Sequence, residues 1–144
     1  MIDPKELRIF NWIEYEGKPN KVLAIHSPAP HKNPALDGKC MIEINPPDSF
    51  FVPVDDISPI PLTEEWLTRF GFEKATDAIG GYWSPSFDTN TVGLRWEFGE
   101  HIDTFRDIYW SYCVSGTYNV KAKYVHQLQN AIFVLLGKEL ELKP

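Results

Sequence analysis

The sequence predicts an α+β protein of 144 residues with a small barrel-like β unit at 1–60 and a helix–antiparallel meander–helix unit at 61–144. Three observations favour this class. Short β-prone runs separated by turn residues fill the first sixty positions. Residues 64–70 carry helix signals at both ends. Alternating aromatic runs then precede a closing amphipathic segment. No flexible linker separates the two parts.

The first sixty residues alternate between β-prone runs and turns. The runs 9–15 and 21–26 flank the turn-rich EGKPN segment and predict a β-hairpin. A loop with three prolines, 27–38, precedes an alternating strand at 39–45. A further short strand at 50–54 contains a proline that favours a sheet edge. The order and spacing of these runs resemble small barrels of the SH3, Tudor and KOW kind.

Residues 64–70 predict a short helix that is fixed at both ends. Thr63 is a suitable N-cap, and acidic residues follow it in the first turn, where the helix dipole favours them. Leu62 and Leu67 have the spacing of a hydrophobic staple. Gly71 is placed to end the helix in the left-handed conformation.

An antiparallel meander of three or four strands is expected after that helix, because apolar and polar residues alternate in several successive runs. These runs span residues 80–87, 91–98, 107–114 and 117–123. A helix at about 124–136 follows. The alternating segment 138–143 is compatible with a last strand or with a tail along the sheet.

The closing helix carries a polar cluster formed by His126, Gln127, Gln129 and Asn130. On a helical wheel these four side chains diverge, so they do not form a catalytic group. Gln129 falls at the edge of the apolar arc and is predicted to be partly buried, with its amide bonded to the backbone of the sheet or barrel. His126 falls at the boundary, whereas Gln127 and Asn130 are predicted to face solvent. Gly137 ends the helix.

Two blocks, PIPLTEEWLTRFGFEK and YVHQLQNAIFVLLGKEL, resemble blocks of an uncharacterised family found in gut anaerobes and in their phages and prophages. The segment LRIFNWIEY is similar to the start of its members. The resemblance implies no reaction, ligand or partner. It does imply an association with phages or mobile elements and favours a single compact unit.

The net charge of −6, shared equally between the two halves, disfavours a nucleic-acid partner, since phosphate binding needs a basic surface. The N-terminus has no apolar run of signal-peptide length, and no apolar span of transmembrane length occurs. We therefore expect a soluble, cytoplasmic protein without a membrane partner. Cys40 and Cys113 lie in apolar segments and are predicted to be buried thiols, although a single bridge is the alternative.

No complete catalytic, cofactor or metal-ligand set is visible in the sequence. His26 and His31 flank a proline-containing loop without a third ligand nearby, so we expect surface histidines and no metal. Glu100, His101 and Asp103 lie within four residues and are compatible with an acid–base group or with an ordinary polar turn.

Exposed aromatic rings provide the main functional signal. Tyr15, Trp83, Tyr109 and Tyr118 fall on the less apolar sides of their predicted strands or next to turns. Such rings can stack on bases, peptides or methylated side chains. The alternative is that they pack between the halves of the protein or pair across strands.

These observations favour a non-enzymatic protein-binding or accessory protein that uses no cofactor. One alternative is a nucleic-acid accessory protein that uses an aromatic barrel face. A second alternative is an enzyme of undefined type centred on His101 and Asp103.

Overall fold

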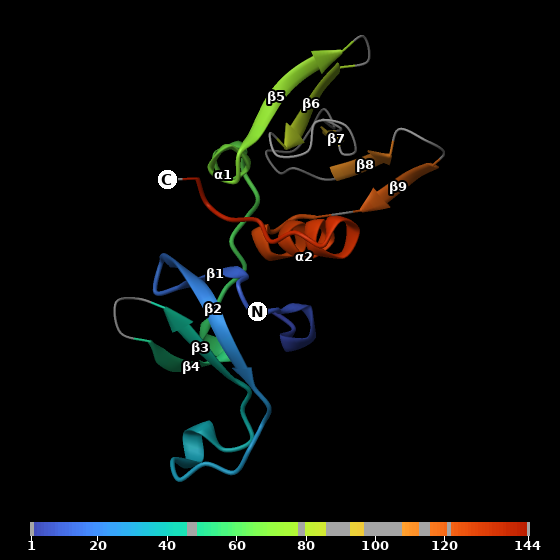
Figure 1. Cartoon of the computed structure of the whole chain (residues 1–144). Helices are drawn as coiled ribbons and strands as arrows, with labels where there is room; N and C mark the ends of the chain where they lie inside the picture. Colours follow the sequence, from blue (N-terminus) through green and yellow to red (C-terminus); the bar gives the residue numbers. More distant parts are fainter. Residues whose placement is uncertain are drawn as a thin grey trace, which may run out of the picture. The chain divides into compact units, whose positions relative to one another are not determined.

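The computed structural model shows an α+β protein (Figure 1). Contacts divide the chain into two units, Met1–Ile60 with Tyr124–Asn130, and Pro61–Lys123 with Ala131–Pro144. The division after Ile60 falls where the sequence changes from strands to helix, but the start of the last helix groups with the first unit. The structure describes residues 2–45, 49–77, 80–85, 93–96, 108–112, 116–120 and 122–143.

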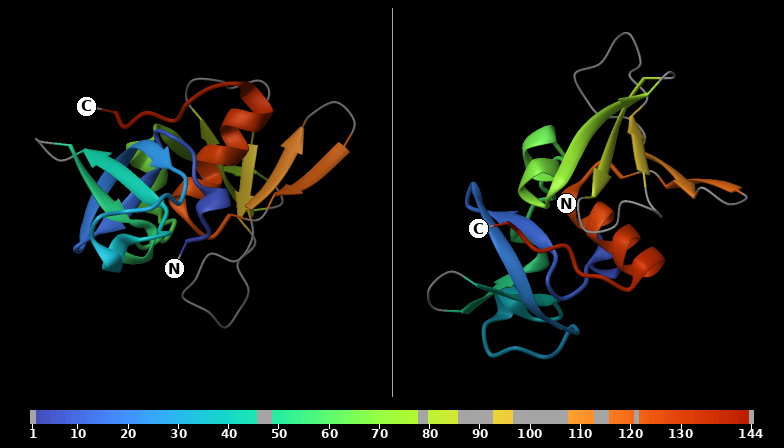
Figure 2. Two further views of the ribbon diagram at one scale, coloured as in Figure 1. Left: turned by 90° about the horizontal axis from the view of Figure 1, so that it is seen from below. Right: turned by 45° about the horizontal axis from the view of Figure 1, so that its top comes forward.

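The first unit contains an antiparallel sheet in the order β1-β2-β3-β4 (Figure 2). Its strands are β1 (Trp12–Tyr15), β2 (Lys18–His26), β3 (Met41–Asn45) and β4 (Phe50–Pro53). The β1–β2 turn consists of Glu16 and Gly17, whose φ values of 49° and 73° fit the tight turn that suits a twisted hairpin. Pro19, which the sequence places in the turn, lies in β2.

This sheet is open and does not form the closed barrel expected from the sequence. In the described part of the chain β4 pairs with β3 alone, and β1 and β4 occupy opposite edges. Beyond β1, two backbone hydrogen bonds of 2.8 Å join Glu14 and Ser58 in an isolated bridge. A closed barrel requires its first and last strands to pair. The bridge joins β1 to Ser58 and not to β4, so it does not close the sheet.

A cluster of aliphatic side chains on one face of this sheet forms the core of the first unit. Alternation in β3 places Ile42 and Ile44 in this core with no exposed surface, whereas Met41 and Glu43 lie on the outer face. Each fully buried isoleucine stabilises the fold by about 1.5–3 kcal/mol. The remaining members are Ile2, Leu7, Ile13, Val22, Cys40, Val52, Val54 and Ile57.

Three short 3-10 helices accompany the sheet: η1 (Pro4–Glu6), η2 (Pro34–Leu36) and η3 (Val54–Asp56). Of these, η2 lies in the long loop 27–40 between β2 and β3, called the β2–β3 loop below (Figure 1). Prolines begin η1 and η2, as expected because proline lacks the amide that the first turn leaves unpaired.

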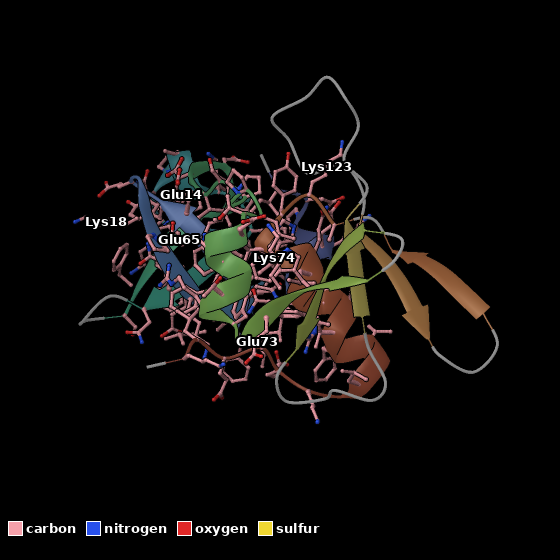
Figure 3. The ribbon with its side chains drawn as sticks, turned by 90° about the horizontal axis from the view of Figure 1, so that it is seen from above. Glu14, Lys18, Glu65, Glu73, Lys74 and Lys123 are labelled. Atoms are coloured by element: carbon pink, nitrogen blue, oxygen red, sulfur yellow. The ribbon has the colours of Figure 1, made fainter. Side chains whose placement is uncertain are left out.

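The second unit begins with α1 (Glu64–Arg69). Thr63 Oγ1 accepts a hydrogen bond from Trp66 N at 3.4 Å, which is the N-cap geometry. Gly71 has a φ of +81° and donates its N–H to Thr68 O at 2.9 Å, so the helix ends in the left-handed conformation. Lys74, labelled in Figure 3, donates to Glu64 Oε1 at 3.0 Å.

A five-stranded antiparallel sheet in sequential order follows α1. The strands are β5 (Phe72–Asp77), β6 (Gly80–Pro85), β7 (Gly93–Trp96), β8 (Ile108–Tyr112) and β9 (Gly116–Val120). The sequence predicts three or four strands here and misses β5, because FEKATD lacks a clear apolar alternation.

The last helix, α2 (Val125–Leu136), ends at Gly137, whose φ is +64° and whose N–H donates to Phe133 O at 2.8 Å. The alternating segment 138–143 forms no strand, and Lys143 N donates to Arg69 O at 2.7 Å. None of the helices described has the length and apolar character needed to cross a membrane.

Candidate functional site

A small cleft lies in the first unit where the β2–β3 loop meets the outer face of the sheet. Its volume of about 280 Å³ is near the lower end for ligand sites, so it fits one bulky side chain better than a whole cofactor. We call it the loop cleft. Its described lining consists of His26, Ser27, Ala29, Pro30, His31, Leu36, Lys39, Met41 and Phe51.

Three lining residues come from consecutive strands and share the outer face of the sheet. His26 in β2 lies opposite Met41 in β3, and Phe51 in β4 lies opposite Glu43, two positions along from Met41. The rings of His26 and Phe51 meet edge to face, with centroids 5.0 Å apart and planes at 74°. Phe51 remains 53% exposed, so its ring is accessible at the side of the cleft.

The β2–β3 loop is held in shape by its own hydrogen bonds. His31 Nδ1 accepts from Asn33 N, and His31 N donates to Asp37 Oδ1, both at 3.0 Å. Gly38 N donates to Ala29 O at 3.3 Å, which closes the base of the loop. Together with the three prolines of the loop, these bonds lower the entropy that would be lost when the cleft binds a ligand.

Lys39 and His31 supply hydrogen-bond donors to the loop cleft. Lys39 Nζ lies 3.2 Å from Asp55 Oδ2, and both side chains are about two-fifths exposed (38% and 41%). Because His31 Nδ1 accepts a hydrogen bond, a neutral His31 ring carries its proton on Nε2 and presents a donor there. His26 and Ser27 complete the polar lining, and no acidic side chain is among the described lining residues.

The aromatic residues predicted from the sequence do not assemble into this site. Tyr15 is partly buried against the core of the first unit, and its ring meets Phe50 edge to face at 5.6 Å. Partial burial, with the neighbouring Glu16 carboxylate, raises the pKa of the Tyr15 hydroxyl above its usual value. Tyr15 therefore serves a packing role and lies outside the lining of the loop cleft.

The prediction that Trp83 is exposed is wrong. Trp83 is only 5% exposed, and it lies in β6, an inner strand that pairs with both β5 and β7. Tyr109 and Tyr118 lie in β8 and β9, in register with Asn119 and Trp110 respectively, so they are not opposite each other in the ladder. Their side chains lie outside the described part of the structure.

The predicted acid–base group of Glu100, His101 and Asp103 lies outside the described residues, as does Cys113. Cys40 is buried, and burial raises the pKa of its thiol, which favours the unreactive protonated form. Within the described segments, no group of three or more histidine, cysteine or acidic side chains is arranged to hold a metal.

The polar cluster of α2 attaches the helix to the N-terminal segment. Gln129 is fully buried, and its Oε1 accepts from Trp12 N at 2.8 Å while its Nε2 donates to Phe10 O at 3.0 Å. Asn130 Nδ2 donates to the backbone oxygen of Glu6 at 2.6 Å. These contacts form a structural tether.

Two expectations about this cluster are corrected. His126 is 1% exposed rather than at the boundary of the helix, and its Nε2 lies 3.4 Å from Glu6 Oε2. Gln127 Nε2 donates to the same carboxylate oxygen at 3.3 Å, so His126, Gln127 and Asn130 all converge on Glu6. The helical wheel could not show this convergence, because it contains no information about the segment packed beside the helix.

The loop cleft is the candidate site because it combines concavity, an exposed ring and a preorganised loop. Comparisons of the chain with known protein families, with curated proteins and with solved structures found no match.

Proposed function

We propose that this protein is a non-enzymatic binding protein whose first unit holds a short segment of a partner protein in the loop cleft. The observation that carries the proposal is the half-exposed Phe51 ring, set edge to face against His26 at the side of an apolar cleft. Because Phe51 is already about half buried, covering the rest of its ring with a partner side chain contributes about 0.8–1.5 kcal/mol. Aromatic anchors of this kind supply much of the affinity in peptide recognition.

The electrostatics of the site favour a protein partner over a nucleic acid. The chain carries −6, and the one lysine in the described lining already faces Asp55. A nucleic acid would bring several phosphates to this surface, and each requires a cation for neutralisation. The aromatic nucleic-acid alternative also loses support from Tyr15, whose ring packs against the core.

Binding also accounts for the cleft better than catalysis. Ser27 lines the cleft with His26 and His31, but no hydrogen bond joins Ser27 to either ring in the described residues. A serine nucleophile requires such a bond to a base for activation. The proposal includes peptide binding in the manner of SH3 or Tudor domains. It also includes a cytoplasmic role of the protein in a phage or mobile element.

A peptide selection tests this function. A displayed library of random dodecapeptides is selected on the immobilised protein, and the dissociation constants of the selected peptides are measured by fluorescence polarisation. We expect Phe51→Ala to weaken binding about tenfold or more, because it removes the exposed ring of the site.

Phe50→Ala provides a matched control from the same strand. Phe50 is 36% exposed, but it lies opposite Ile44 and packs on Tyr15, so it belongs to the other face of β4. Its truncation should change affinity less than about twofold. Circular dichroism spectra of both variants, compared with the wild type, check that they fold. The proposal is refuted if selection returns no binder, or if the two variants bind equally well.

A further inference from the structure

We propose that the segment bound by the loop cleft carries an acidic side chain beside its apolar anchor, with the carboxylate at the Lys39 end of the cleft. This inference rests on the proposed function and specifies its ligand. The anchor contacts Phe51 and His26, and the acidic residue contacts Lys39.

Charge complementarity is the first reason. The titratable side chains in the described lining are His26, His31 and Lys39, and none of these can carry a negative charge. The protein as a whole is acidic, yet no acidic side chain belongs to the described lining of the cleft. A carboxylate satisfies several such donors at once, because each of its oxygens accepts more than one hydrogen bond.

Lys39 has donors available for a ligand. Its ammonium group has three N–H donors, and the contact with Asp55 Oδ2 at 3.2 Å is a partly exposed pair. Such pairs contribute little stability, so Lys39 can share its charge with an incoming carboxylate. The Nε2 donor of His31 belongs to the same lining, and its tautomer is fixed by the hydrogen bond from Asn33 N.

Charged groups around the cleft determine the orientation of the ligand, and the Asp55 carboxylate beside Lys39 is already paired with the lysine ammonium group at 3.2 Å. Glu43 lies on the outer face of the sheet opposite Phe51, outside the lining of the cleft. A carboxylate of the ligand would be repelled at that end. Asp37 faces the loop backbone, since its Oδ1 accepts from His31 N. The acidic residue of the ligand therefore lies toward Lys39, and the apolar anchor lies toward Phe51.

A phosphorylated segment fits the site less well than an acidic one. A phosphate group carries close to two charges and is usually held by arginine, which binds it with two parallel hydrogen bonds. The described lining contains no arginine, and its single lysine is shared with Asp55. A carboxylate brings less negative charge to the side of Asp55 than a phosphate group does.

Three fluorescein-labelled, C-terminally amidated peptides test the inference. All three are built on the tightest selected sequence, and they differ only in having Glu, Gln or Lys next to the aromatic or apolar anchor. We expect the Glu peptide to bind the wild-type protein about two- to fivefold more tightly than the Gln peptide, with the Lys peptide weakest. The preference should decrease as the sodium chloride concentration is raised.

Two variants connect this preference to Lys39. Lys39→Gln keeps part of the aliphatic stem and a polar end but removes the charge, so the Glu and Gln peptides should bind it equally. Asp55→Asn removes the competing carboxylate, so it should strengthen binding of the Glu peptide about twofold. Both positions are partly exposed, and the fold should tolerate both substitutions.

The outcomes separate the two proposals. Equal binding of the Glu and Gln peptides to the wild-type protein, with Phe51→Ala still weakening both, refutes the acidic ligand and leaves the proposed function standing. A preference for Glu that persists in Lys39→Gln also refutes the assignment to Lys39. Binding of all three peptides that is insensitive to Phe51→Ala refutes the proposed function and this inference together.

Discussion

Gln129→Met should destabilise the protein strongly, because it removes both hydrogen bonds of a fully buried amide. Methionine retains the length and helix propensity of glutamine, so the substitution tests the hydrogen bonds rather than the helix. Trp12 N and Phe10 O would lose their partner. An orphaned buried polar group costs about 1–3 kcal/mol, and the lower half of that range applies because both bonds are only partly buried. We expect a loss of about 2–4 kcal/mol in the free energy of unfolding.

Urea unfolding followed by circular dichroism and tryptophan fluorescence measures this loss. With an m-value of about 2 kcal/mol/M, the midpoint should fall by roughly 1–2 M. Gln127→Met is the matched control, since Gln127 lies on the same helix but its Nε2 contacts the exposed carboxylate of Glu6. Its cost should be within about 0.5 kcal/mol. If Gln129→Met is no more destabilising than Gln127→Met, the tether does not stabilise the fold.

Two further predictions concern α1 and α2. Thr63→Ala should lower the free energy of unfolding by about 1 kcal/mol through loss of the N-cap. Thr68→Ala should have a smaller effect, because the Thr68 hydroxyl donates to Glu64 O on an exposed surface. Equal urea midpoints of the two variants would contradict the capping role of Thr63. Burial lowers the pKa of His126 below its usual value of 6.5, although Glu6 opposes the shift. The folded state therefore binds a proton less readily than the unfolded state, so the His126 contribution is complete above about pH 6.5 and is lost as the pH falls toward the lowered pKa. Urea midpoints measured between about pH 7.5 and 5.5 should fall more steeply for the wild type than for His126→Gln, and parallel curves would exclude this contribution.

Much of the local structure follows from short-range patterns. Thr63 and Gly71 bound α1 because capping depends on residues adjacent to the helix. The alternation around Ile42 and Ile44 identifies the buried face of β3 for the same reason, since side chains in a strand alternate by geometry. Gln129 was predictable as a tether because an amide on an apolar arc needs a partner. Its two partners, which lie 117 and 119 residues earlier, were not predictable from the helix alone.

The loop cleft could not be found from sequence patterns. Its floor combines His26, Met41 and Phe51 from three different strands, and its wall comes from the loop between two of them. The sequence predicts His26 and His31 as independent surface residues, and it identifies 50–54 only as a strand with a proline. The register of β3 against β4 determines which ring faces outward, and a shift of one residue would replace Phe51 by Phe50 or Val52 on that face.

The geometry at Gln129 also explains why this helix belongs partly to the first unit. A primary amide presents one acceptor and one donor, as a peptide group does. The Gln129 Oε1 accepts from Trp12 N and its Nε2 donates to Phe10 O, the backbone groups on either side of Asn11. The side-chain amide therefore makes the pair of hydrogen bonds that one peptide group of a neighbouring strand would make. β1 is the edge strand of its sheet, and Phe10 has a left-handed φ of 71°, which prevents a regular ladder from continuing there. A helix amide can satisfy such an irregular backbone where another strand could not. Together with the bridge between Glu14 and Ser58, this amide covers the edge of the sheet at β1, which limits pairing with other chains there.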